Sequence, residues 1–209
     1  KARSASDSEA GRIFESERGK KPSDSKAYGS ESGKETKMVN FKENEELKTL
    51  NHSCAHVMAQ AIKHLYPQAK FWVGPVVAEG FYYDVDLGDA VIRDEDIEKI
   101  EKEMKKVCKS GKRIVRKEIS KEEAKEMFKD DEYKLDLIEG LEDGNITCYE
   151  QGDFTDLCRG PHVENVKLCR NFKLIRHSGA YWKGDSKNKV LQRIYGVCFP
   201  TPEELEDHL

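Results

Sequence analysis

Residues 50–66, LNHSCAHVMAQAIKHLY, decide how the rest of the chain is interpreted. Apolar side chains recur in this stretch at i, i+3, i+4 and i+7, which is the spacing of a helix with one apolar stripe. The stripe consists of Cys54, Val57, Met58, Ala61, Ile62 and Leu65. Pro67 helps to end the helix, because proline cannot continue the hydrogen-bond ladder. The pattern therefore predicts an amphipathic helix.

Strand-like and helical patterns alternate after this helix. Residues 70–73 and 80–86 are apolar and aromatic runs on either side of Gly74-Pro75, which predicts a hairpin. Residues 94–110 begin with acids, end with bases and stop at Gly111, as a helix does. Further strands are expected at 113–119, 146–150, 172–177 and 190–197, and short helices at 120–128 and 133–138. The sequence predicts an α+β fold, an antiparallel or mixed sheet with helices packed on it, one of them long.

The two ends of the chain differ from this middle part. Residues 1–37 are rich in Ser, Gly, Lys and Glu, a composition that buries too little apolar surface to offset the entropy of ordering. We expect a disordered tail or linker there and one folded domain over 38–201. Residues 202–209, PEELEDHL, read as the start of a linker helix that leads to a further domain outside this chain.

Composition limits the class of protein. The 36 basic residues against 40 acidic residues give a net charge of −4, so only a local patch could attract nucleic acid. Six irregularly spaced cysteines are typical of free thiols in a reducing compartment. With no signal segment or membrane-length apolar run in the sequence, we expect a cytoplasmic protein with no membrane partner.

His52 and His56 are the first candidates for chemistry. Four residues apart, they project from one side of the predicted helix, roughly opposite its apolar stripe. Ala55 and Ala59 keep the surface low beside them, as the wall of a site requires. The same pattern also fits two histidines on a solvated helix face.

A second candidate cluster lies in residues 153–162, DFTDLCRGPH, which read as a turn-rich loop. Cys158 and His162, added to His52 and His56, offer three imidazoles and one thiol. This set could form a zinc site with an open position or a pocket that activates water. Cys158 could also be a nucleophile with a histidine as its base, and a capped turn with a hydrogen-bonded histidine is the purely structural alternative.

Basic side chains gather in three local groups. The groups are Lys109, Lys112, Arg113, Arg116 and Lys117; Lys167, Arg170, Lys173 and Arg176; and Lys183, Lys187, Lys189 and Arg193. Tyr181 and Trp182 lie among them as possible stacking groups for bases. An RNA-binding surface and an ordinary solvated surface both fit this pattern.

Five ordered motifs resemble the editing domain of bacterial and eukaryotic threonyl-tRNA synthetases over about residues 39–209. They are HSCAH at 52–56, GFYYD at 80–84, DLCRGPH at 156–162, AYWKGD at 180–185 and LQRIYG at 191–196. The editing domain of alanyl-tRNA synthetases is similar, but it has small residues between the cysteine and histidine of the third motif. Arg159, Gly160 and Pro161 fill that gap here, which favours the threonyl family.

The resemblance implies a function and a set of site residues. The reaction would be hydrolysis of serine wrongly attached to tRNA(Thr), with no covalent intermediate. Catalytic residues would be His52, Lys134, Cys158 and His162, and substrate-binding residues would be His56, Tyr83 and Asp156. His52 would act as base, and Lys134 as a second base, a group that orients water or a cation for the oxyanion. Tyr83 and the edge of His52 would exclude the threonine methyl group.

The resemblance also implies limits. The ATP-binding synthetic domain and the anticodon-binding domain of such a synthetase would lie outside this chain, and the parent would be a homodimer. The threonyl branch is understood to edit without a required metal, so we expect no cofactor, although zinc fits the ligand types. The alternatives are a non-catalytic tRNA-binding or regulatory fragment and a zinc hydrolase of another substrate.

Overall fold

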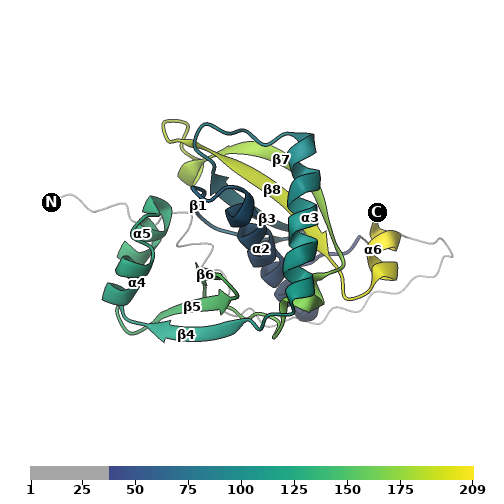
Figure 1. Cartoon of the computed structure of the whole chain (residues 1–209), viewed down its shortest axis with the longest axis horizontal. Coiled ribbons are helices and arrows are strands. Elements are labelled where there is room, and N and C mark those ends of the chain that lie inside the picture. The colour runs from purple at the N-terminus through teal and green to yellow at the C-terminus, as the bar shows by residue number, and fades with distance from the viewer. Residues whose placement is uncertain (1–37) are drawn as a thin grey trace, which may run out of the picture.

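The structure is a computed structural model that describes residues 38–209 (Figure 1). The helices are α2 (Glu45–Leu65), α3 (Asp94–Ser110), α4 (Lys121–Met127), α5 (Glu132–Glu139) and α6 (Pro202–His208), with 3₁₀ turns η1 (Val166–Cys169) and η2 (Trp182–Gly184). The strands are β1 (Lys70–Phe71), β2 (Val76–Val77), β3 (Gly80–Asp86), β4 (Val115–Ile119), β5 (Ile146–Gln151), β6 (Phe154–Leu157), β7 (Phe172–Tyr181) and β8 (Val190–Cys198). The tail predicted at 1–37 lies outside the described residues.

Two antiparallel sheets organise the domain, which confirms the predicted α+β class. The larger sheet has the order β1-β3-β8-β7, with β2 also paired to β3, and the smaller sheet has the order β4-β5-β6. Helices α2 and α3 lie side by side over one face of the larger sheet (Figure 1). The main apolar core lies between these two helices and that sheet. The predicted hairpin is present, because β1 pairs with β3.

Helix α2 is longer and more buried than its sequence pattern indicated. It begins at Glu45, where the side chain of Asn44 caps it by accepting a hydrogen bond from the Leu47 amide. From Leu50 to Ile62 every residue except the half-buried His52 is buried. The side that carries the histidines is therefore covered, and the interpretation as a solvated face was wrong. The apolar stripe also ends earlier than predicted, since Leu65 is exposed.

Helix α3 matches the predicted residues 94–110. Gly111 follows it in the left-handed conformation, with φ 63°, a backbone geometry that glycine adopts without strain. Three acids in the first turn and a lysine in the last complement the helix dipole. The local signals at both ends of this helix were sufficient to place it.

The segment 153–162 is not the loop that its composition suggested. Its first half forms β6, which pairs with β5 through Tyr149 opposite Asp156 and Cys148 opposite Leu157. Phe154, Asp156 and Leu157 are all buried. A buried aspartate among these positions breaks the usual alternation of apolar and polar residues, which is why the strand was missed. Strand β7 also extends beyond its prediction, to Tyr181.

Residues 202–208 form helix α6, with Thr201 as its cap and Pro202 in its first turn, so a helix does begin where the sequence predicted it. Its role as a linker to a further domain stays a prediction, as do the bounds 38–201 of the folded domain. Among the helices of residues 38–209, none is both long and apolar enough to cross a lipid bilayer.

Candidate active site

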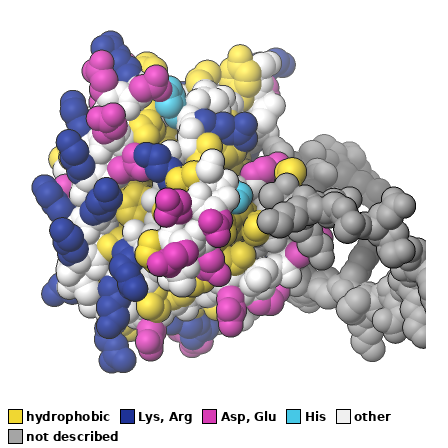
Figure 2. Space-filling model, turned by 90° about the vertical axis from the view of Figure 1, so that its right-hand side faces the viewer, with side chains coloured by type: hydrophobic (Ala, Val, Ile, Leu, Met, Phe, Trp, Pro, Cys, Tyr) yellow, Lys and Arg dark blue, Asp and Glu magenta, His cyan; other side chains and the backbone are white. Residues whose placement is uncertain are grey.

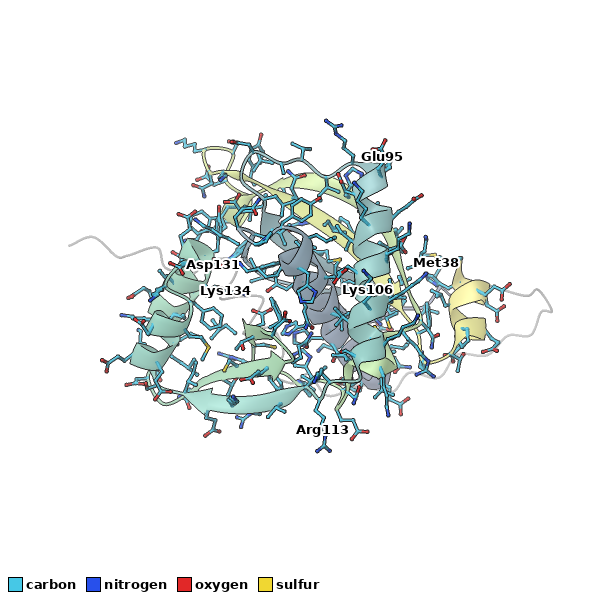
Figure 3. All side chains as sticks on the ribbon, in the orientation of Figure 1. Met38, Glu95, Lys106, Arg113, Asp131 and Lys134 are labelled. Carbon is cyan, nitrogen blue, oxygen red and sulfur yellow. The ribbon has the colours of Figure 1, made fainter. Side chains whose placement is uncertain are left out.

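A cavity of about 450 Å³ lies where α2, the loop at 72–77, α5 and the segment at 156–161 meet. Lys134 lies on the side of α5 that faces α2 (Figure 3). Six of the predicted site residues line the cavity: His52, His56, Tyr83, Lys134, Asp156 and Cys158. The seventh, His162, contacts Cys158 through its ring. The structure thus brings all seven predicted residues together from four separate elements and the segment that follows β6.

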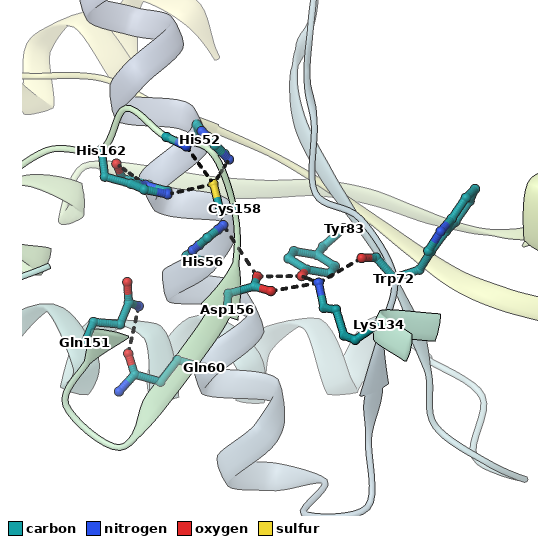
Figure 4. A network of polar contacts seen from close by, with 12 residues as sticks. His52, His56, Gln60, Trp72, Tyr83, Lys134, Gln151, Asp156, Cys158 and His162 are labelled. Carbon is teal, nitrogen blue, oxygen red and sulfur yellow. Dashed lines mark hydrogen bonds and ion pairs between the residues drawn. The ribbon is translucent and has the colours of Figure 1, made fainter. Parts of the chain in front are cut away.

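Asp156 is the centre of a buried charged network (Figure 4). Its carboxylate forms an ion pair with Lys134 (2.7 Å) and accepts a hydrogen bond from the Tyr83 hydroxyl (2.6 Å). The Lys134 ammonium also donates to the Tyr83 hydroxyl and to the Trp72 carbonyl, both at 2.9 Å. Two of its three N–H groups are thus hydrogen-bonded, and the remaining close contact is the ion pair with Oδ1 of Asp156.

Cys158 is the centre of a second cluster beside this network (Figure 4). Its sulfur lies 3.2 Å from Nε2 of His52 and 3.2 Å from Nε2 of His162. The backbone N–H of Gly160 donates to the same sulfur at 3.1 Å. The thiol and two imidazoles are close enough to share protons through hydrogen bonds.

Ser53 fixes the position of this cluster from behind. Its hydroxyl lies 3.0 Å from Nδ1 of His162 and accepts the backbone N–H of Val163 at 2.9 Å. The same hydroxyl donates to the Thr49 carbonyl one turn earlier in α2. One serine therefore ties the segment after Cys158 to the helix that carries His52.

His56 connects the two clusters. Its Nε2 lies 3.4 Å from Asp156, and its ring lies 4.3 Å from the ring of His162. Burial lowers the pKa of His56 well below its usual value, and His52 and Lys134 lower it further. Burial also lowers the pKa of His162, with His56 and His52 adding to the effect. Both imidazoles are neutral near pH 7 and can each donate one proton and accept one.

The ring of Tyr83 is one rigid wall of the cavity. Burial raises the pKa of its hydroxyl well above the usual value, and the adjacent Asp156 raises it further, so the hydroxyl stays a donor. Gly74 lies against this ring, and a Cβ at Gly74 would come within 2.4 Å of a Tyr83 ring carbon. A larger residue at Gly74 would displace the wall.

Four side chains of the site have the types and spacing of a zinc site. One ligand atom from each of His52, His56, Cys158 and His162 lies within 4.8 Å of the others. Ligand atoms around a tetrahedral zinc are about 3.5 Å apart, given zinc bonds of about 2.0 to 2.3 Å. Nδ1 of His56 is buried and has no hydrogen-bond partner among the described residues, and the Ser53 hydroxyl contacts Nδ1 of His162 and so holds its ring. The residue types and their grouping therefore fit a bound zinc.

Sequence reasoning did not find the supporting residues Ser53, Gly74 and Trp72. Their contributions are a hydroxyl behind His162, a missing Cβ and a backbone carbonyl, and none of these has a sequence signature of its own. The side chain of Trp72 is buried in an apolar cluster. Its carbonyl, however, belongs to the site.

The three basic groups lie on different elements. The first is at the end of α3 and on β4, the second on and after η1 and on β7, and the third around the turn between β7 and β8 and on β8. Several of their lysines pair with acids: Lys117 with Glu150, Lys173 with Glu101 and Lys189 with Asp86. On the face shown in Figure 2, Lys and Arg side chains gather mostly along the left-hand side, and Asp and Glu side chains lie mostly toward the middle. Trp182 packs edge-on against Tyr133, with ring centroids 5.1 Å apart. It is partly a packing residue and not a free stacking group.

Known protein sequences match the part of the chain that holds the site. Residues 146–195, which include Asp156, Cys158 and His162, match the family described as threonyl and alanyl tRNA synthetase second additional domain. Threonine–tRNA ligases of Staphylococcus aureus strains JH9 and Newman are each 55% identical to the chain over 166 residues, which is 79% of this chain and 26% of theirs. The chain thus spans about a quarter of the length of these relatives.

The fold and the site together define a second additional domain of an aminoacyl-tRNA synthetase. The match to threonine–tRNA ligases extends beyond the segment that the family model matches, and it covers 79% of the chain. The chain belongs to the threonyl-tRNA synthetase family, as the five motifs implied. Its role is therefore related to tRNA.

Proposed function

We propose that this domain removes serine from tRNA(Thr) by hydrolysing the ester between the amino acid and the terminal ribose. The observation that carries the proposal is one cavity in which a buried carboxylate, paired with Lys134 and Tyr83, lies beside neutral imidazoles. Ester hydrolysis needs a held amino acid, a positioned water and a base, and the two clusters can supply these separately. The family match supports tRNA as the substrate.

Asp156 is the group that binds the substrate ammonium. Its Oδ2 accepts from the Tyr83 hydroxyl and lies 3.4 Å from His56, while Oδ1 forms the ion pair with Lys134 and has no hydrogen-bond partner among the described residues. Oδ1 can therefore accept a hydrogen bond from the ammonium of serine. Lys134, paired with this carboxylate, orients it and provides positive charge near the developing oxyanion. The network argues against Lys134 as the base, because a base needs a free lone pair.

The hydrogen bonds around Cys158 lead to one assignment of protons. Ser53 donates to Thr49 (2.8 Å), so its oxygen accepts from Nδ1–H of His162. The neutral His162 ring then accepts the thiol proton of Cys158 at Nε2, and the sulfur accepts from Nε2–H of His52. The lone pair of His52 is therefore on Nδ1, and we assign that atom as the base.

The reaction then needs no covalent intermediate. Nδ1 of His52 takes a proton from water as the water oxygen attacks the ester carbonyl, and returns it to the departing ribose oxygen. The products are serine and tRNA with a free terminal hydroxyl. Cys158 remains a thiol throughout, because its proton is shared with His162, and the two residues shape the pocket and hold water.

Discrimination against threonine depends on size. One methyl group changes binding by only about 1 to 3 kcal/mol, so a synthetic site needs a second site to remove serine. The Tyr83 ring, fixed by Asp156 and by its contact with Gly74, and the edge of His52 form the wall that the threonine methyl would strike. The wall must be rigid, because a wall that could move aside would admit threonine as well as serine.

We propose that this hydrolysis proceeds without a metal, since the proton assignment above closes with neutral rings and a thiol. If zinc binds, His52, His56, Cys158 and His162 would hold it, and it would polarise water or the ester carbonyl. Elemental analysis of the purified chain, with deacylation measured before and after chelation, distinguishes the two cases.

The wider context is also proposed. The partner is the acceptor end of tRNA(Thr), the parent synthetase is a cytoplasmic homodimer, and no membrane is involved. Threonine activation and tRNA charging would belong to parts of the parent beyond this chain. The domain alone would then act only on tRNA that has already been charged.

The test is deacylation of seryl-tRNA(Thr) by the unaltered chain and by His52→Ala. We expect rapid loss of serine with the unaltered chain and a rate near background with the variant. His177→Ala is the matched control, because His177 pairs with Asp94 away from the cavity and its loss should leave the rate unchanged. Equal, background-level rates in all three proteins contradict the proposal, and tRNA binding without turnover would identify a non-catalytic fragment.

A further inference from the structure

A row of stacked tyrosine and arginine side chains crosses the larger sheet on the face opposite α2 and α3. Side chains alternate along β3, and Phe81, Tyr83 and Val85 belong to the core with α2, so Tyr82 projects from the other face. Tyr82 is opposite Tyr195 on β8, and Tyr195 is opposite Arg176 on β7.

The members of this row are in direct contact. The rings of Tyr82 and Tyr195 have centroids 5.4 Å apart. The guanidinium of Arg176 lies 4.1 Å from the Tyr195 ring, and that of Arg193 lies 4.1 Å from the Tyr82 ring. Asp84 holds Arg193 in place through two hydrogen bonds of 2.8 and 2.9 Å. We call these four stacked side chains, Tyr82, Tyr195, Arg176 and Arg193, the Tyr–Arg platform.

Part of the platform faces solvent, although both ends of the same face are covered. Leu191, on the same face of β8, is buried in one apolar cluster, and Val197 is buried in another. Between them Arg176 is exposed, and Tyr82, Arg193 and Tyr195 are half-buried. The solvent-facing surfaces of Arg176 and Tyr195 are of the guanidinium and aromatic kinds on which unpaired bases stack.

The platform is also continuous with the active-site cavity. Tyr82 belongs to both, and its backbone N–H donates to the carbonyl of Pro75 in the loop that borders the cavity. Lys48 and Arg159 line the same cavity and place further positive charge near it. A row across three strands about 4.8 Å apart is about 10 Å long, which suits the two or three bases that sheet platforms stack.

We propose that the Tyr–Arg platform binds the unpaired nucleotides that precede the terminal adenosine of the tRNA. This inference rests on the proposed function, which places the terminal adenosine and its ester in the cavity. The platform would hold the single strand by stacking and by the charge of Arg176, outside the reacting groups. It would therefore contribute to binding of a polynucleotide substrate and not to the chemical step.

The test compares two substrates that carry serine as an ester on the ribose of a terminal adenosine. One is an RNA hairpin with a single-stranded CCA end, and the other is adenosine 5′-monophosphate, which is too short to reach the platform. For Tyr195→Ala and for Arg176→Ala we expect KM for the hairpin to rise about tenfold, the loss typical of one stacked base, with kcat unchanged. Turnover of the mononucleotide ester should not change. Tyr195→Phe retains the ring and should retain the original KM.

Arg170→Ala is the charge-matched control, because Arg170 follows η1, which packs against α2 and α3 on the other side of the sheet. Thermal unfolding of each variant checks that the fold is intact. An unchanged KM for the hairpin in both platform variants overturns the inference and leaves the proposed function standing. If the unaltered chain hydrolyses neither ester, the proposed function fails. Binding of a CCA-ended RNA oligonucleotide, measured by fluorescence anisotropy, then tests the platform alone. Equal affinity of the unaltered chain and Tyr195→Ala for this oligonucleotide overturns the inference about the platform.

Discussion

Lys134 and Asp156 form a buried ion pair in the candidate site, and burying the two charges costs free energy. Both side chains are almost fully buried, and their charges compensate each other in an ion pair of 2.7 Å between Nζ and Oδ1. Desolvation of two charges is expensive, so a pair of this kind adds little stability compared with an apolar pair, but the loss of one partner is severe. Its retention in the cavity fits a role in binding and orienting the substrate.

Replacing Lys134 with Met should therefore destabilise the domain strongly. We expect the free energy of unfolding to fall by about 3 to 5 kcal/mol, because Asp156 is left buried without its cation. Urea unfolding measures the loss. Lys183→Met removes the cation of a surface pair with Asp136 (3.0 Å) and should cost less than about 1 kcal/mol. Similar losses in the two variants would contradict the buried-pair account.

Elements differ in how far the sequence alone determines them. Helix α3 was predicted over its whole length because its dipole-matched ends and Gly111 are local signals. The start of α2 at Glu45 was missed because the apolar pattern begins only at Leu50, whereas the cap at Asn44 and the acids after it set the true start. Strand β6 was missed because the buried Asp156 looks like a loop residue.

The grouping of the site was predictable in part. The His-x3-His spacing on a helix and the Cys-x3-His spacing indicated a shared pocket, and the structure brings them together. Lys134 could be added only through the family resemblance, since nothing in its local sequence marks it. The contacts of Ser53 with His162 and Val163 were not predictable, because they join residues more than a hundred positions apart.

Ser53→Ala tests how strongly α2 fixes the segment after Cys158. The substitution removes the acceptor of the Val163 N–H and the partner of His162, and we expect a loss of about 1 to 3 kcal/mol for buried groups left unpaired. Hydrogen exchange followed by mass spectrometry should show faster exchange at residues 158–163. Unchanged exchange there would mean that Ser53 does not hold the segment.

At the scale of the whole molecule, the smaller sheet is joined to the helical layer through His64. This histidine of α2 contacts Glu103 of α3 at 2.9 Å and Asp153 of the β5–β6 turn at 2.8 Å, and Gln60 and Lys106 contact the same two acids. Burial opposes the charged form, but the hydrogen bonds to Asp153 and Glu103 outweigh it and raise the pKa of His64 above 6.5. The folded state therefore binds this proton more tightly than the unfolded state.

This difference gives a pH dependence with a definite sign. The stabilisation by His64 is fully present below its unfolded pKa and is lost as the pH rises through its folded pKa. The difference in unfolding free energy between the unaltered chain and His64→Gln should be largest near about pH 5.5 and smallest near about pH 8.5. Urea unfolding at both values measures it. A difference that grows with pH would show that His64 is not held as a cation.

The cavity exists only because the two sheets and α2 meet, so the discrimination between amino acids that we propose would be a property of the whole domain. The central claim is that the cavity admits serine and excludes threonine, which is one methyl group larger. Hydrolysis of seryl-tRNA(Thr) and threonyl-tRNA(Thr) by the unaltered chain, measured side by side at equal concentration, tests this most directly. We predict rapid release of serine and release of threonine near the background rate. Equal release of both amino acids, or of neither, would contradict the account.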